Sequence, residues 1–135
     1  MELESIIERM AEEQGLVLVA VEQGPGFLRV FVDGDRGVSV EECAALSRRL
    51  ERFLDKGYPI QGPYTLEVSS PGLDRELKTR REMVWAIGKR VRAVTRGGRV
   101  LSGRLISVSD EEINLEGEVL SVRDLARLNL AEVDT

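Results

Sequence analysis

A break in the hydrophobic pattern at residues 69–75 constrains the fold more than any other feature of the sequence. Helical and strand periodicities alternate before it, whereas short strand-like runs dominate after it. The break contains Pro71, which stops strand pairing, and Gly72, which permits a tight turn. The sequence therefore predicts two domains, residues 1–72 and residues 73–135, each close to the lower size limit for independent stability.

The pattern of residues 1–72 predicts the order α-β-β-α-β. An amphipathic helix ends near Gly15, and two strands joined by a Gly-Pro-Gly turn form a hairpin over residues 16–33. Ser39 stands three residues before Glu42, which is the capping-box signature of a second helix that ends at Gly57. Residues 64–69 alternate as a third strand. We expect a two-layer α/β domain with both helices on one face of the sheet.

The pattern of residues 73–135 predicts a short leading helix and a small β-barrel. Residues 79–87 form one or two helical turns, and five strands follow at 90–95, 99–108, 112–115, 119–122 and 125–130. Gly97 and Gly98 predict a two-residue hairpin turn between the first two strands. The regular strand spacing favours a barrel. The predicted fold class is α+β.

The composition argues against catalysis and against metal binding. The chain has no histidine and one cysteine, Cys43, so the usual proton shuttle and the usual zinc ligands are missing. Ser69 and Ser70 have no general base close in sequence, and the acidic residues lie on solvated helix faces or in turns. We predict no catalytic residue, no cofactor, no metal site and no small-molecule substrate. A small hydrolase or transferase that uses carboxylates or lysine is the disfavoured alternative.

The sequence also predicts where the chain resides. No stretch approaches the roughly 20 apolar residues of a membrane helix, and the first residues are acidic and amphipathic, unlike a secretory signal. The lone Cys43 cannot form an intrachain disulfide. We expect a cytoplasmic monomer that does not bind membranes.

Positive charge is concentrated in the middle of the chain. Residues 1–74 carry 7 Lys+Arg against 14 Asp+Glu, residues 75–104 carry 10 against 2, and residues 105–135 carry 2 against 8. The net charges are therefore −7, +8 and −6. Such a segment predicts a surface for phosphate or for an acidic partner. The candidate binding residues are Arg75, Lys78, Arg80, Arg81, Lys89, Arg90, Arg92, Arg96, Arg99 and Arg104.

The sequence predicts the direction of two of these side chains and offers one further loop motif. Arg90 and Arg92 point to the same side of a strand, because side chains alternate with period two. The loop from Gly34 to Gly37 matches the Gly-x-x-Gly pattern that grips a nucleic-acid backbone, but it follows a strand and carries more acid than base. A strand-to-helix turn is the favoured interpretation of that loop.

The run Tyr64-Thr-Leu-Glu-Val-Ser-Ser-Pro-Gly-Leu-Asp-Arg75 closely resembles the signature of the bacterial RimP family of ribosome maturation factors, in which it joins two domains. The resemblance extends over nearly the whole chain. Residues 39–48 resemble the family's second helix, and residues 88–91, 103–105 and 125–130 resemble its barrel strands. The interdomain motif comprises Ser69, Ser70, Pro71, Gly72, Leu73, Asp74 and Arg75.

The resemblance implies a C-terminal barrel of the SH3/Sm-like kind and a non-catalytic role in ribosome biogenesis. It implies binding to the immature small (30S) ribosomal subunit, near a ribosomal protein of the decoding region and ribosomal RNA. A free-standing Sm-like RNA-binding protein that acts on messenger or small RNA is the alternative. The family usually has proline after the Asp-Arg pair, whereas this sequence has Glu76, so the φ angle at this position is expected to be less fixed.

Overall fold

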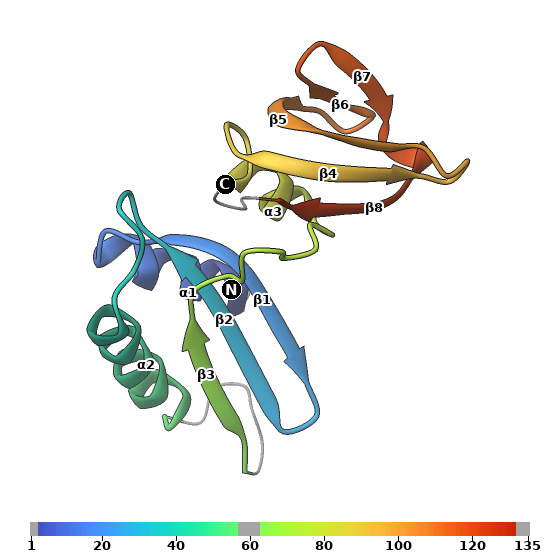
Figure 1. Cartoon of the computed structure of the whole chain (residues 1–135). Helices are drawn as coiled ribbons and strands as arrows, with labels where there is room; N and C mark the ends of the chain where they lie inside the picture. Colours follow the sequence, from blue (N-terminus) through green and yellow to red (C-terminus); the bar gives the residue numbers. More distant parts are fainter. Residues whose placement is uncertain (1–2, 57–62, 132–135) are drawn as a thin grey trace. The chain divides into compact units, whose positions relative to one another are not determined.

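A computed structural model describes residues 3–56 and 63–131 of the protein, which divides into two compact units (Figure 1). The N-terminal unit is Met1–Pro71 and the C-terminal unit is Gly72–Thr135. Each unit has its own hydrophobic core.

The N-terminal unit has the predicted order of elements (Figure 1). Its elements are α1 (Leu3–Glu13), β1 (Val17–Gly24), β2 (Phe27–Asp33), α2 (Val40–Leu54) and β3 (Thr65–Ser69). The sheet has the order β1-β2-β3, in which β1 and β2 form an antiparallel hairpin and β3 runs parallel to β2. The strand β3 is therefore an edge of this sheet.

Both helices of this unit pack against one face of the sheet. In β2, Leu28, Val30 and Val32 are fully buried, and they form one cluster with Ile7 of α1 and Leu50 of α2. The predicted amphipathic patterns are confirmed, because their apolar stripes are the residues that meet in this core. The expected helix stop at Gly57 lies outside the described residues.

The capping box predicted for the second helix is confirmed. The hydroxyl of Ser39 accepts a hydrogen bond from the Glu42 backbone N–H at 3.0 Å, and the Glu42 carboxylate accepts one from the Ser39 N–H at 2.9 Å. These two bonds satisfy amide groups that have no partner within the helix. They fix the start of α2 at Val40.

The C-terminal unit contains one short helix and an antiparallel sheet of five strands (Figure 1). Its elements are α3 (Arg80–Trp85), β4 (Arg90–Thr95), β5 (Val100–Val108), β6 (Glu112–Leu115), β7 (Glu118–Ser121), the 3-10 turn η1 (Val122–Asp124) and β8 (Leu125–Leu130). The strand order is β7-β6-β5-β4-β8. The leading helix and all five strands were predicted. Closure of the sheet into a barrel is not shown, since β7 and β8 are its two ends in the described residues.

The turn between β4 and β5 differs from the prediction. Thr95 N–H donates to the Arg99 carbonyl at 2.9 Å, and Gly98 N–H donates to the Thr95 carbonyl at 3.0 Å. The loop therefore contains three residues, Arg96 to Gly98, rather than two. Gly98 has a φ of 92°, as in hairpins whose turn ends in a left-handed glycine. The Gly-Gly pair alone did not distinguish the two loop lengths.

The first residues of the C-terminal unit pair with its last strand. Leu77 N–H donates to the Leu128 carbonyl at 2.7 Å, and Leu130 N–H donates to the Arg75 carbonyl at 2.8 Å. Glu76 lies between these two bonds, opposite Asn129. In an antiparallel ladder this places the N–H and C=O of Glu76 on the side away from β8. The hydrogen bonds of Arg75 and Leu77 with β8 thus hold the backbone at Glu76, where the family's proline would have fixed the φ angle.

We therefore expect Glu76→Pro to be tolerated. Proline lacks an N–H, but position 76 donates none to β8, so the change in unfolding free energy should stay within about 1 kcal/mol and favour the variant. Urea unfolding followed by the fluorescence of Trp85, the only tryptophan of the chain, measures this effect. Leu77→Pro is the control, because it removes a ladder bond. A loss in Glu76→Pro as large as that in Leu77→Pro would contradict this assignment.

Candidate nucleic-acid interface

The outward face of β4 carries the densest group of exposed arginines. Arg90 and Arg92 are exposed, whereas the alternating residues Val91 and Ala93 are fully buried. The predicted direction of these side chains is thus confirmed. Arg90 lies directly opposite Arg104 of β5 in the strand register. Like charges directly opposite each other weaken strand pairing, so this arrangement does not serve the stability of the sheet.

The strand β8 adds another arginine to this face. Arg127 lies opposite Val94 of β4, and Asn129 lies opposite Arg92. Leu128 and Leu130 are buried, so Arg127 and Asn129 point outward with the β4 arginines. Arg127 was missed in the sequence because it stands in an acidic segment. We call Arg90, Arg92, Arg104 and Arg127 the arginine face.

Glu116 partly neutralises the arginine face. Its carboxylate lies 3.7 Å from the Arg90 guanidinium, with about half of each side chain exposed, and it accepts a hydrogen bond from the Arg104 backbone N–H at 2.8 Å. Ion pairs between exposed side chains contribute about 0–1 kcal/mol. Arg90 can therefore exchange Glu116 for a stronger anion at little cost.

The predicted Arg96 lies in the loop between β4 and β5 and Arg99 directly follows it, and both side chains have partners. The Arg96 guanidinium donates to the Arg123 carbonyl at 2.7 Å. The Arg99 guanidinium lies 2.8 Å from the Glu118 carboxylate. Arg123 is itself exposed and brings a further cation to this loop, which the sequence did not indicate because η1 is distant along the chain.

Four other predicted binding residues of the C-terminal unit each have an interaction partner. Arg80 forms an exposed ion pair with Asp110. The amine of Lys78, 71% exposed, lies 4.0 Å from Glu76. The amine of Lys89 lies over the Trp85 ring, 5.0 Å from its centre. Arg81 is half-buried and has an interaction partner. None of these four belongs to the arginine face as defined above.

Arg75 requires a correction, because its side chain is internal rather than part of a binding surface. Its guanidinium donates to the Glu82 carboxylate at 2.6 Å, and the two side chains are 12% and 3% exposed. The same carboxylate accepts hydrogen bonds from the backbone N–H groups of Lys78 and Thr79 at 3.0 and 2.9 Å. Thr79 and Glu82 form a second capping box, which starts α3. That spacing was visible in the sequence and identifies Glu82 as a structural residue.

The environment of Glu82 lowers the pKa of its carboxyl group. Burial raises the pKa, but the Arg75 hydrogen bond, the backbone hydrogen bonds from Thr79 and Lys78 and the Arg75 charge together outweigh this effect. A carboxyl group with a lowered pKa in the folded state binds more protons after unfolding. The stabilisation is therefore present above the unfolded pKa, about 4.3, and is lost as the pH falls through the folded pKa.

We expect the C-terminal unit to lose stability as the pH falls below about 4.3. The urea midpoint of Trp85 fluorescence, measured between pH 7 and pH 3, reports this loss. Glu82→Gln removes the titrating group, so its midpoint should fall less steeply with pH. Identical slopes in the two proteins would rule out Glu82 as the source.

Two other motifs singled out in the sequence, the loop of residues 34–37 and the interdomain motif, contain hydrogen-bonded turns. The loop from Gly34 to Gly37 joins β2 to α2, and Gly37 N–H donates to the Gly34 carbonyl at 3.0 Å, so the turn interpretation is confirmed. In the interdomain motif, Arg75 N–H donates to the Gly72 carbonyl at 3.2 Å, and Leu73 is 73% exposed. The hydrogen bond closes a turn within the motif.

Over residues 3–56 and 63–131, no group of three or more His, Cys, Asp or Glu side chains is placed to hold a metal ion. In the same part of the chain, no helix has the length and apolar character needed to cross a membrane.

The N-terminal part of the chain matches a known protein family. The family model described as the RimP N-terminal domain matches residues 6–74. This match spans just over half of the chain and includes most of α1, the three-stranded sheet, α2 and most of the interdomain motif.

Proposed function

The chain belongs to the RimP family of ribosome maturation factors, and from this membership we propose that it binds the immature small ribosomal subunit and assists its assembly. The family is non-catalytic, so the proposed action is binding alone. A protein that binds one arrangement of an assembling particle better than another shifts the population toward that arrangement.

We assign ribosomal RNA contact to the arginine face. The observation that carries this assignment is the direct opposition of Arg90 and Arg104, with Arg92 and Arg127 on the same outward surface. Guanidinium groups bind phosphate oxygens through paired hydrogen bonds, which makes closely spaced arginines suited to an RNA backbone. A phosphate between Arg90 and Arg104 would relieve the repulsion between them and take the place of Glu116.

The sheet of the C-terminal unit supports a further proposal about its architecture. We infer that the five strands form a barrel of the SH3/Sm-like kind. The strand order β7-β6-β5-β4-β8, the bulge in β5 between Leu105 and Ser107 and the 3-10 turn before β8 favour this class. Bulges bend strands in this way at the corners of barrels.

The acidic N-terminal unit has a different proposed partner. Residues 1–74 have twice as many acidic as basic residues, so this unit repels RNA and favours a basic protein. We propose that it meets a ribosomal protein near the decoding region while the arginine face meets RNA. The two units would then contribute contacts of opposite charge.

Binding to immature small subunits should weaken steeply with salt. Four phosphate contacts give a slope of about 3 in a plot of log affinity against log salt, so raising salt from about 50 to 200 mM lowers affinity about 50- to 150-fold. Sedimentation of the tagged protein with ribosomal particles from cells measures this response. A flat response would remove RNA from the proposed contact. Equally tight binding to isolated RNA would favour the free-standing RNA-binding alternative.

A further inference from the structure

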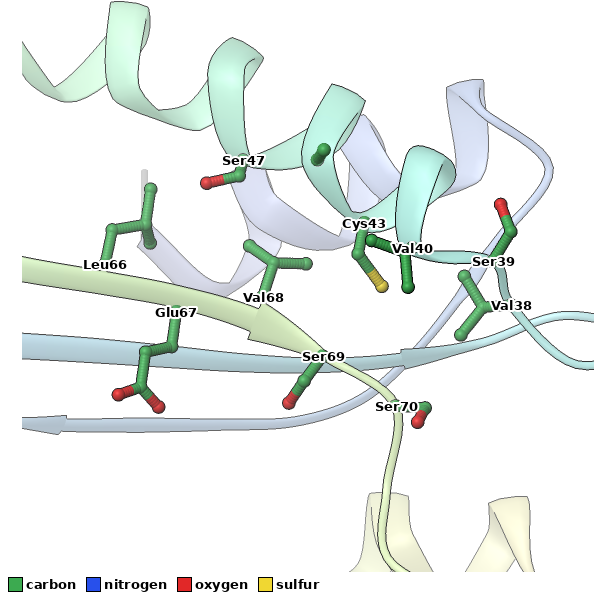
Figure 2. A pocket seen from close by; sticks show the side chains of 11 residues that line it. Val38, Ser39, Val40, Cys43, Ser47, Leu66, Glu67, Val68, Ser69 and Ser70 are labelled. Atoms are coloured by element: carbon green, nitrogen blue, oxygen red, sulfur yellow. The ribbon is translucent and has the colours of Figure 1, made fainter.

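A groove lies between α2 and β3 in the N-terminal unit (Figure 2). It has a volume of about 580 Å³. Leu66 and Val68 rise from β3 toward α2, and Cys43 projects from α2 toward the strand (Figure 2). Ala44 and Ser47 of α2 also line the groove, and their small side chains leave space beside the strand.

One wall of this groove is the free edge of β3. Thr65 N–H donates to the Gly26 carbonyl at 2.8 Å, so Thr65 faces β2. In a strand of a parallel pair, the N–H and C=O of one residue both point toward the partner strand, and those of the next residue both point to the opposite side. The N–H and C=O of Leu66 and Val68 therefore point away from β2. No strand among the described residues pairs with this edge, which leaves it open to an added extended chain.

The acidic residues that a groove occupant could meet lie at the start of β3. Of the described residues that line the groove, Glu67 is the only charged one, but its side chain points away from α2 (Figure 2), and its carboxylate accepts a hydrogen bond from Arg29 at 3.2 Å. At the start of β3, the Tyr64 hydroxyl donates to the Asp55 carboxylate at 3.2 Å. The pKa of Tyr64 is raised by burial, by this bond and by the charges of Asp55 and Glu51, so both carboxylates lie near that end. A basic occupant would be attracted there, whereas RNA would be repelled.

We propose that this groove binds an extended, basic protein segment, which adds to β3 as a fourth strand. Its backbone pairs with Leu66 and Val68, its alternate apolar side chains enter the groove, and a Lys or Arg meets Glu51 and Asp55. Addition of a strand to a sheet edge is an established way of recognising peptides, with main-chain bonds for affinity and alternate side chains for specificity.

This inference deepens the proposed contact between the N-terminal unit and a basic ribosomal protein, and it rests on that proposal for the partner's origin. The binding itself is testable on the purified full-length chain without ribosomes. Failure of peptide binding would therefore overturn the proposal that the groove binds a protein segment, whereas failure of subunit binding would overturn the proposed function.

The test uses three synthetic heptapeptides and the single cysteine of the chain. The basic peptide is Lys-Val-Arg-Val-Lys-Val-Arg with blocked ends. One control replaces its basic residues by Glu and Asp, and the other carries N-methyl groups on alternate amides. Because burial and Glu42 raise the pKa of Cys43, its reaction with a thiol reagent is followed at mildly alkaline pH. At ten times the dissociation constant, the basic peptide should slow labelling about tenfold, since about one site in eleven remains empty.

Hydrogen exchange locates the contact. Without peptide, the amides of Leu66 and Val68 should exchange faster than those of Thr65 and Glu67, which face β2. The basic peptide should slow Leu66 and Val68, and the two control peptides should leave both unchanged. Equal protection by all three peptides, or none by the basic peptide, would overturn the proposal. Protection that rises with protein concentration alone would show a second copy at the edge, and would also overturn it.

A matched pair of variants separates the groove from general charge effects. Ser47→Arg places a cation in the groove, and Ser5→Arg places one on the exposed face of α1. Ser47→Arg should abolish the slowing of exchange at Leu66 and Val68, and Ser5→Arg should preserve it. Equal loss in both variants would assign the effect to net charge and contradict a specific site.

Discussion

Replacing Glu82 by alanine is expected to lower the free energy of unfolding of the C-terminal unit by about 3–5 kcal/mol. The variant leaves the Arg75 guanidinium, 12% exposed, without its carboxylate partner. It also removes the acceptor of two backbone N–H groups, those of Lys78 and Thr79. An uncompensated buried charge is among the most destabilising changes that a small domain can undergo.

Trp85 fluorescence during urea unfolding measures this loss, because the only tryptophan lies in α3 and reports on the C-terminal unit alone. Glu111→Ala, at an exposed acidic position of the same unit, is the control and should change stability by less than about 0.5 kcal/mol. Arg75→Met combined with Glu82→Gln should be more stable than Glu82→Gln alone, since it removes the unpaired guanidinium. Equal stability of Glu82→Ala and Glu111→Ala would contradict a structural role for the pair.

Reversing the charges of Arg90 and Arg92 together is expected to weaken binding to immature small subunits about 100-fold or more. Each charge-assisted hydrogen bond contributes about 1.5–3 kcal/mol, and the two new carboxylates repel phosphate. The salt slope should also fall, by about 1.4–1.8 for two lost contacts. Both side chains point outward from β4, so the sheet should remain folded.

The matched control for this experiment is Arg9→Glu combined with Arg52→Glu, at exposed positions of α1 and α2. It changes the net charge by the same amount on the other unit. Sedimentation with small subunits compares the two double variants, and Trp85 fluorescence confirms that the C-terminal unit is folded in each. An equal loss of binding in the two double variants would show that net charge, and not the position of the arginines, causes the effect. Unchanged binding of the β4 variant would remove Arg90 and Arg92 from the site.

Much of the fold was predictable because local patterns and tertiary packing agree. Charged and apolar residues alternate over residues 90–93 at the start of β4, and the structure buries Val91 and Ala93 as that alternation requires. Ser39 and Glu42 signalled the start of α2 through a capping box confined to four residues. Features encoded within a single helix or strand can be identified without knowing what packs against them.

Features that depend on pairing between distant residues were predicted less well. Arg127 joins the arginine face only because β8 pairs with β4, and its acidic neighbours in sequence concealed it. Arg75 was counted with the surface cations because its partner, Glu82, was not identified as the acceptor. A count of charges along the chain cannot separate a buried ion pair from an exposed patch. The register of the sheet makes that distinction here.

The pairing of residues 75–77 with β8 sets an order of events during synthesis of the chain. Asp74 and Asn129, joined by a hydrogen bond from the Asn129 side chain, are 55 positions apart. Translation at roughly 5–20 residues per second needs about 3–11 s to cover this interval. During this interval all three strands of the N-terminal sheet have already been synthesised, whereas β4 still lacks its neighbour β8. The arginine face thus comes together only after β8 has left the exit tunnel, so a newly made chain completes its acidic N-terminal unit before this face.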